Sequence, residues 1–241
     1  YSFTGSGIRL ERTFGGPEDL PTRSPEEAVG ALGFVGEAVA EVRRRLGDTQ
    51  ALLGFAGAPW TLALYLTEGG APGEGRNMRR LLRAAPEAAF ALVDLLTESV
   101  RLHLGGQIQA GADAVQLFDS WASLCPHEFF DRLCVEPARR IAAGLGDAPL
   151  IHFPRGAGAR LAAFADTGVA ALGVDWATSL AEARRQLPPG FPLQGNLDPV
   201  LLEGEPEDVV PAVRKILDAW SPAEPLVLNL GHGLTPAAKP G

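Results

Sequence analysis

Side chains that can bind a ligand or take part in catalysis follow six short apolar runs along the chain. Most are polar or aromatic, and they are Trp60, Thr61 and Tyr65; Asp119, Ser120 and Trp121; Arg155; Asp175 and Trp176; Asn196 and Asp198; and His232 between two glycines. Such residues after every run are more than generic turns would need. Their spacing predicts one site assembled from loops, above all from segment 229–233.

The two cysteines, Cys125 and Cys134, do not carry obvious chemistry. They form no CxxC pair. We interpret both as small buried apolar residues in a reducing compartment, and we expect no metal site.

The elements that must position these residues alternate along the chain. The apolar runs, each about five residues long, suit parallel strands that are covered on both faces. They lie at 51–55, 114–118, 149–153, 169–174, 191–195 and 226–230. Helical patterns lie near 24–46, 86–110, 126–144, 158–165, 179–187 and 205–220, with capping boxes predicted at Ser24 and Ser179. Such alternation predicts a parallel sheet.

Two parallel topologies remain open on periodicity alone, a doubly wound sheet and a closed eight-stranded barrel. No GxGxxG fingerprint opens a helix, which weakens a dinucleotide-binding sheet. A barrel needs two more strands than the runs supply. Residues 1–7 resemble the middle of a loop, and residues 236–241 close no element. We expect a single α/β-barrel domain over 1–241 that is incomplete at both ends.

Composition narrows the class of protein. The chain has 241 residues, of which 46% are hydrophobic and 21% charged, so it can bury a core. The net charge of −8 argues against a surface that attracts nucleic acid. No apolar run reaches the ~18 residues that would span a bilayer, and no signal peptide is visible. We expect a cytoplasmic protein with no membrane partner.

Five segments together resemble the uroporphyrinogen decarboxylases of haem biosynthesis, in the order and at spacings compatible with that family. They are GFAGAPWTL at 54–62 with Tyr65 and EGG at 68–70, GADAVQLFDSWA at 111–122, GVDW at 173–176, QGNLDP at 194–199 and NLGHG at 229–233. A GHG triplet alone would be weak evidence, but five ordered segments across nearly the whole chain are specific.

The resemblance implies a (β/α)8 TIM barrel, here without its first strands and its final helix, that acts as a cytosolic homodimer. It implies decarboxylation of the four acetate side chains of uroporphyrinogen III to give coproporphyrinogen III. Family members use no cofactor and no metal. A protonated pyrrole can itself accept the electrons that remain as CO₂ leaves, a role that organic cofactors play elsewhere.

Three substrate contacts carry over from the resemblance. Tyr65 follows the GAPWT segment, Ser120 belongs to FDSWA, and His232 is the histidine of GHG; each would bind a substrate carboxylate. Their structural alternatives are a core tyrosine, a capping serine and a buried histidine. Arg155 is a weaker candidate for neutralising carboxylates. Asp198 fits a turn better than an acid or base.

Two further aspartates, Asp119 and Asp175, each end a strand and are expected to anchor loops or to bind at the pocket wall. The catalytic aspartate of the family, which binds the pyrrole nitrogens, lies N-terminal to the matched region, as does an arginine-rich segment that holds carboxylates. We therefore expect a chain that begins at Tyr1 to be inactive alone.

Two alternatives stay open. The first is a zinc-dependent methyltransferase of the same barrel superfamily, which would need His-x-Cys at the third run, where this chain has His152-Phe153-Pro154. The second is a barrel that binds a tetrapyrrole or a partner chain without catalysis.

Overall fold

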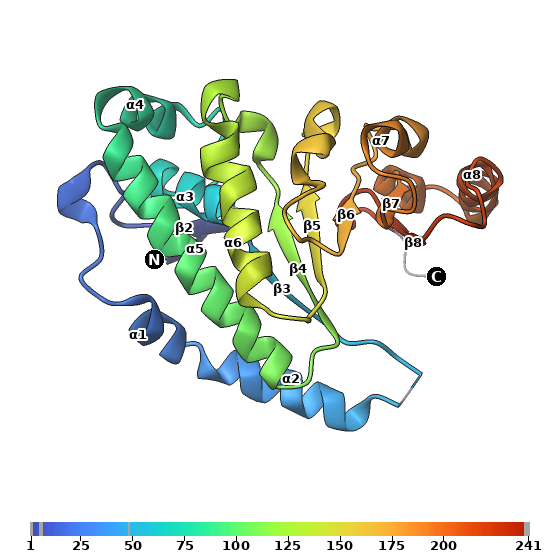
Figure 1. Cartoon of the computed structure of the whole chain (residues 1–241), viewed down its shortest axis with the longest axis horizontal. Coiled ribbons are helices and arrows are strands. Elements are labelled where there is room, and N and C mark those ends of the chain that lie inside the picture. The colour runs from blue at the N-terminus through green and yellow to red at the C-terminus, as the bar shows by residue number, and fades with distance from the viewer. Residues whose placement is uncertain (1, 5–6, 48, 239–241) are drawn as a thin grey trace.

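A six-stranded parallel sheet forms the centre of the molecule, with strands in the order β3-β4-β5-β6-β7-β8 (Figure 1). The computed structural model describes residues 2–4, 7–47 and 49–238. The strands are β3 (Leu53–Gly57), β4 (Ala114–Asp119), β5 (Leu150–Pro154), β6 (Ala171–Gly173), β7 (Leu193–Leu197) and β8 (Leu226–Leu230). Each lies on one of the six predicted runs, with ends that shift by up to two residues, and the predicted parallel pairing is confirmed.

Helices connect successive strands and cover the convex face of the sheet, where α5 and α6 stand in front of it in Figure 1. The α-helices are α1 (Pro25–Gly30), α2 (Gly33–Arg45), α3 (Pro59–Glu68), α4 (Arg76–Ala84), α5 (Pro86–Gln109), α6 (Glu136–Gly144), α7 (Leu180–Gln186) and α8 (Pro206–Asp218). Shorter turns of helix are η1 (Pro17–Asp19), η2 (Ala122–Leu124), η3 (His127–Phe129), the π-helical η4 (Asp131–Val135), η5 (Gly158–Phe164) and η6 (Pro199–Glu203).

The core lies between the sheet and this helical layer. Trp60 of α3, Leu92 of α5, Leu117 of β4 and Phe164 of η5 are all buried there. Each large apolar side chain of this kind contributes roughly 1.5–3 kcal/mol when it is removed from water. The layer therefore fixes the convex side of the sheet and leaves the opposite side free to form a site.

Helix α3 is an element that the apolar run pattern did not predict. Its segment was expected as a loop after the first strand, but Pro59 begins a helix that ends at Gly69, whose φ of 80° is left-handed and favours glycine. The N-terminal segment packs along it, because Leu10 N–H donates to the Gly69 carbonyl and Phe14 N–H to that of Leu66, each at 2.9 Å.

Three local predictions need correction. Residues 2–4 and 7–9 form a small antiparallel hairpin, β1 (Ser2–Thr4) with β2 (Gly7–Arg9), where a loop was expected. The helix expected over 24–46 is two helices that break at residues 31 and 32, although its capping box between Ser24 and Glu27 is confirmed. Ser179 makes no side-chain cap bond to α7, so the second capping box was wrong.

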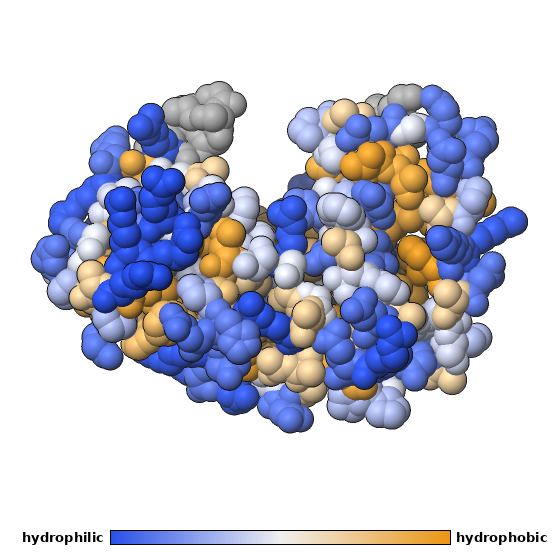
Figure 2. All heavy atoms as spheres, turned by 90° about the horizontal axis from the view of Figure 1, so that it is seen from above, coloured by the Kyte–Doolittle hydropathy of each residue, from blue (hydrophilic) through white to orange (hydrophobic). Residues whose placement is uncertain are grey.

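The outer strands β3 and β8 do not close the sheet among the described residues. Phe55 of β3 is 64% exposed and Val227 of β8 is 51% exposed, so apolar side chains stand open at both edges. A closed barrel of this class has eight strands. The fold is thus a part of a (β/α)8 barrel, and Figure 2 shows it as a crescent, hollowed opposite the helical layer.

No helix of the described chain is both long and apolar enough to cross a membrane.

Candidate functional site

A cavity of about 290 Å³ lies on the concave face of the sheet, toward the carboxyl ends of the strands. We call it the lumen cavity. Five adjacent strands, β4 to β8, and the loop after β8 contribute to its wall. Its lining residues are Gln116, Phe118, Ser120, Phe153, Gly173, Val174, Gln194, Asn229, Leu230, His232 and Gly233. Function concentrates at this end of parallel barrels, so the lumen cavity is the candidate active site.

Two of the three predicted substrate contacts meet here. Ser120 follows β4, shares a face with Gln116 and Phe118, and is half-buried; His232 follows β8 and is exposed. Within the described part of the chain, the His232 ring makes one polar contact, a long one of 3.4 Å between Nδ1 and the Gly233 carbonyl oxygen. Both side chains therefore keep capacity to hydrogen-bond a ligand in the cavity.

Gln116 and Gln194 are cavity residues that the sequence did not single out. Both are nearly fully buried in mid-strand, and Gln194 Nε2 donates to Gln116 Oε1 at 3.3 Å. Apart from that bond, their amides retain donors and acceptors that face the lumen. The sequence did offer a signal: the apolar runs at 114–118 and 191–195 each contain a glutamine, a residue type that is costly to bury without hydrogen-bond partners.

Tyr65, the third predicted contact, does not line the lumen cavity. It lies on α3 with its side chain 37% exposed, and its hydroxyl accepts a hydrogen bond from Trp121 Nε1 at 3.2 Å. Because Trp121 follows Ser120 directly, Tyr65 is connected to the cavity rim through the loop after β4.

The loop that carries His232 is held by close backbone contacts. Gly231 N–H donates to the Leu197 carbonyl at 2.7 Å, and a Cβ at this glycine would stand 2.3 Å from the backbone nitrogen of Trp176. Only glycine fits at that distance. The glycine before the histidine thus seats the loop after β8 against the loop after β6.

Asp119 faces the helical layer and not the lumen. Its side chain is fully buried and accepts a hydrogen bond from Thr61 Oγ1 at 2.7 Å, while Oδ2 makes none. Burial raises the pKa of Asp119 to about 6, because the hydrogen bond from Thr61 only partly offsets the cost of desolvating the carboxylate. This places Asp119 as an anchor for the loop after β4, one of the two roles expected for it.

The other strand-end aspartates also anchor loops. Asp175 accepts from Gly156 N–H at 2.6 Å and from Ala177 N–H at 2.9 Å. Asp198 accepts from Val200 N–H at 3.0 Å, which confirms the turn that its sequence predicted. Arg155 is half-buried and lies outside the lining of the lumen cavity.

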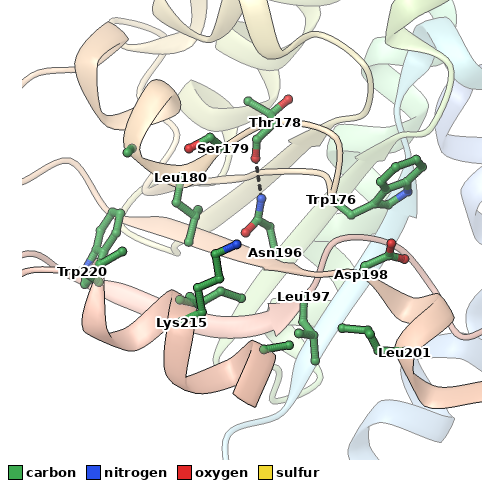
Figure 3. Close-up of a pocket in the computed structure, with 14 residues that line it drawn as sticks. Trp176, Thr178, Ser179, Leu180, Asn196, Leu197, Asp198, Leu201, Lys215 and Trp220 are labelled. Atoms are coloured by element: carbon green, nitrogen blue, oxygen red, sulfur yellow. Dashed lines mark hydrogen bonds between the residues drawn. The ribbon is translucent and has the colours of Figure 1, made fainter. Parts of the chain in front are cut away.

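A second cavity, of about 460 Å³, lies on the other side of β7, between α7 and α8. We call it the outer cavity. In Figure 3, Lys215 of α8 points toward Asn196, whose Nδ2 donates to the Thr178 carbonyl at 2.5 Å, and Trp220 closes one side. Trp176 and Asp198 also line it. Three predicted strand-end residues, Trp176, Asn196 and Asp198, therefore lie on the outer cavity and not on the lumen cavity, so the strand-end residues are divided between two cavities.

The residues considered for metal binding do not converge. His152 of β5 is buried against Phe164, with ring centroids 4.6 Å apart, and neither ring nitrogen has a hydrogen-bond partner among the described residues. Burial lowers the pKa of His152 to about 3. Cys125 and Cys134 are free and buried, as predicted. Within the described ranges no group of three or more His, Cys, Asp or Glu residues could hold a metal ion.

The chain is similar to known proteins over its whole length. The model of the uroporphyrinogen decarboxylase (URO-D) family matches residues 4–241. A uroporphyrinogen decarboxylase of Pseudomonas fluorescens (strain Pf-5) is 39% identical over 249 residues, which cover 100% of this chain and 69% of the relative. A uroporphyrinogen decarboxylase of Methylococcus capsulatus (strain Bath) is 39% identical over 241 residues, which cover 98% of this chain and 69% of the relative.

A solved structure shares the fold at low sequence identity. A methyltransferase from Methanosarcina mazei superposes with a TM-score of 0.78 at 18% identity, covering 97% of this chain and 67% of that one. This likeness supports the barrel fold alone.

Proposed function

The chain belongs to the uroporphyrinogen decarboxylase family, and we propose that its lumen cavity is part of the site that decarboxylates uroporphyrinogen III to coproporphyrinogen III. The substrate is a flexible tetrapyrrole with acetate and propionate side chains. The cavity, at about 290 Å³, is near the lower bound of small-molecule pockets and would hold one part of it.

The observation that carries this proposal is the convergence of Ser120 and His232. They follow β4 and β8, strands that are four positions apart in the sheet, and line the same cavity with Gln116 and Gln194. Hydroxyl, imidazole and amide groups donate hydrogen bonds to carboxylates without introducing a permanent charge beside the reacting pyrrole. The lining thus suits the binding and orientation of acidic side chains.

In this proposal the residues of the chain orient the substrate, and the substrate supplies its own electron acceptor. Protonation of a pyrrole ring lets the electrons of the breaking carbon–carboxylate bond pass into the ring as CO₂ leaves. A second proton then adds to the exocyclic methylene carbon to give the methyl group, and the ring loses the proton that it gained, so one carboxylate is exchanged for one proton. Donors at Ser120, His232 and Tyr65 would hold the neighbouring carboxylates so that the reacting acetate stands out of the ring plane. No cofactor or metal enters this scheme.

The lining of the lumen cavity contains no Arg, Lys, Asp or Glu among the described residues. The family resemblance assigns the pyrrole-binding aspartate and a carboxylate-binding arginine segment to positions N-terminal to the matched region. We propose that activity requires those residues beside Ser120 and His232 in a single barrel domain.

The same proposal includes a homodimer in the cytoplasm, as the family resemblance implies. Two free, buried cysteines fit a reducing compartment. Light scattering coupled to gel filtration on the intact gene product tests the dimer, and cell fractionation tests the location.

The experiment for the function is turnover of uroporphyrinogen III by the intact gene product, with the products separated by carboxylate number. We expect species with seven, six, five and finally four carboxylates. Tetrapyrrole binding without loss of carboxylates from a folded protein would instead indicate a non-catalytic barrel. Stoichiometric zinc together with methyl transfer to a thiol would indicate the methyltransferase.

A further inference from the structure

A series of three hydrogen bonds connects buried Asp119 to exposed Tyr65. Asp119 Oδ1 accepts from Thr61 Oγ1 at 2.7 Å, and the same hydroxyl oxygen accepts from the Trp121 N–H at 3.2 Å. The Trp121 indole then donates from Nε1 to the Tyr65 hydroxyl at 3.2 Å. Thr61 and Tyr65 are one turn apart on α3, so two members of this hydrogen-bonded series are held by one rigid helix.

The backbone of Trp121 is fixed from the other side as well. Trp60 Nε1 donates to the Trp121 carbonyl at 2.9 Å, and Trp60 is itself buried in the core. With its N–H on Thr61 and its carbonyl on Trp60, the peptide of Trp121 has little freedom. The indole is therefore presented to Tyr65 from a firmly held position.

The direction of the last bond has a chemical consequence. An indole N–H is a donor only, so the Tyr65 oxygen must act as the acceptor in this contact. The single hydroxyl proton of Tyr65 is then left for another acceptor. A hydroxyl that accepts one hydrogen bond is polarised toward donating the next.

We propose that Trp121 is a positioning residue for Tyr65: its indole N–H holds the tyrosine oxygen so that the tyrosine proton points to a substrate carboxylate. This inference rests on the proposed decarboxylase function, because it takes the tyrosine as a substrate contact. Asp119 and Thr61 serve by anchoring Trp121, and they do not touch the substrate.

The test is a double-mutant cycle between Trp121→Phe and Tyr65→Phe in the intact gene product. Trp121→Phe keeps an aromatic ring and removes the N–H; we expect kcat/KM to fall about three- to tenfold, as for loss of one neutral hydrogen bond. Tyr65→Phe should reduce it by about tenfold or more, since a bond to a carboxylate is lost. In the Tyr65→Phe background, Trp121→Phe should then cause no further loss.

Trp220→Phe is the matched control, because its Nε1 donates to the Glu224 carbonyl at 2.9 Å, on the outer-cavity side of the molecule. It should leave kcat/KM within twofold of wild type. A loss from Trp121→Phe that is equal in both Tyr65 backgrounds would overturn the proposal, since a merely structural tryptophan acts regardless of the tyrosine hydroxyl. A Trp121→Phe variant with wild-type kinetics would also overturn it.

A second measurement covers the case in which Trp121→Phe does not fold. In a ¹⁵N-indole NMR spectrum, Tyr65→Phe should shift one indole N–H signal and speed its exchange with solvent, and leave the Trp220 signal in place. No change in any indole signal would contradict the bond. Failure of wild type to decarboxylate uroporphyrinogen is a different outcome, because it removes the proposed function and leaves this signal unaffected.

Discussion

The two faces of the central sheet use similar residues in opposite ways, and β4 shows the contrast within two neighbouring positions. Ser120 lines the lumen cavity, whereas Asp119, the residue before it, is sealed beneath α3 by a hydrogen bond from Thr61. The same contrast separates Gln194 in the lumen from His152, which is buried against Phe164 on the helical side.

The face of the strand on which a polar group lies, and not its residue type, therefore decides whether it can bind a ligand. Successive side chains of a strand point to opposite faces, so a shift of one position moves a side chain from the lumen into the core. A carboxylate or an imidazole on the helical side is desolvated and serves the fold. Serine, glutamine and histidine side chains on the lumen side lie along a cavity that a ligand can enter.

The largest expected effect is at the glycine that seats the loop after β8. Gly231→Ala would place a Cβ 2.3 Å from the backbone nitrogen of Trp176, so the loop must move and His232 with it. We expect kcat/KM to fall by roughly 100-fold, because a displacement near 1 Å costs about that much. Steady-state kinetics on the intact gene product measure it.

Gly233→Ala is the matched variant for stability, since a Cβ there meets nothing within 4 Å. Thermal unfolding should show a lower midpoint for Gly231→Ala and little change for Gly233→Ala. Equal midpoints for the two variants would mean that the contact with Trp176 does not hold the loop.

The next effect concerns the lumen histidine. His232→Ala should lower kcat/KM by about 10- to 100-fold, the range for loss of a hydrogen bond to a charged group, without a change in the unfolding midpoint. His127→Ala, at an exposed position on η3, is the control and should match wild type. Wild-type turnover in His232→Ala would remove this residue from the site.

On the helical face, we expect buried His152 to make the free energy of unfolding depend on pH. Burial lowers the folded-state pKa of His152 from 6.5 to about 3, so the unfolded chain binds the proton first as the pH falls. The free energy of unfolding is therefore at its full value above pH 6.5, where His152 is neutral in both states, and it decreases progressively as the pH falls toward 3. At pH 5 this loss is about 2 kcal/mol.

The His152→Leu variant lacks this loss. When the pH is lowered from 7.5 to 5, its free energy of unfolding, measured in urea at each pH, should therefore rise by about 2 kcal/mol relative to that of wild type. The Asp119 pKa, raised to about 6, acts in the opposite direction within wild type, but it is common to both proteins and cancels in their difference. A pH-independent difference would show that His152 is not sealed from water.

The smallest effect is expected at the outer cavity. Lys215→Ala removes the cation that points toward Asn196 in Figure 3, and kcat/KM should stay within twofold of wild type. A fall of tenfold or more would indicate that Lys215 binds substrate carboxylates, and ligand binding would then not be confined to the lumen side of the sheet.

Much of the fold was predictable from the sequence because its signals are local. Apolar runs of about five residues located all six strands, and Pro86 with its periodic apolar residues located α5. Helix α3 was not predicted because six of its residues are buried, so its sequence lacks the polar face that marks an amphipathic helix. The break between α1 and α2 falls between Gly30 and Gly33, where two glycines weaken the helix.

The site was predictable in its residues and less so in its geometry. The segments around Ser120 and His232 pointed to residues that do share a cavity. The placement of Asp119, Trp176 and Asn196 away from the lumen depends on strand register and on how α7 and α8 pack, and neither is a local property. The hydrogen bond between Trp121 and Tyr65 joins residues 56 positions apart, which spacing alone could not reveal.

We have proposed that the lumen cavity belongs to the site of a uroporphyrinogen decarboxylase. The most direct test of this proposal is anaerobic incubation of the intact gene product with uroporphyrinogen III, followed by oxidation and chromatographic separation of the porphyrins by carboxylate number. We predict stepwise loss of four carboxylates that ends at coproporphyrin. A folded protein that leaves all eight carboxylates in place would contradict it.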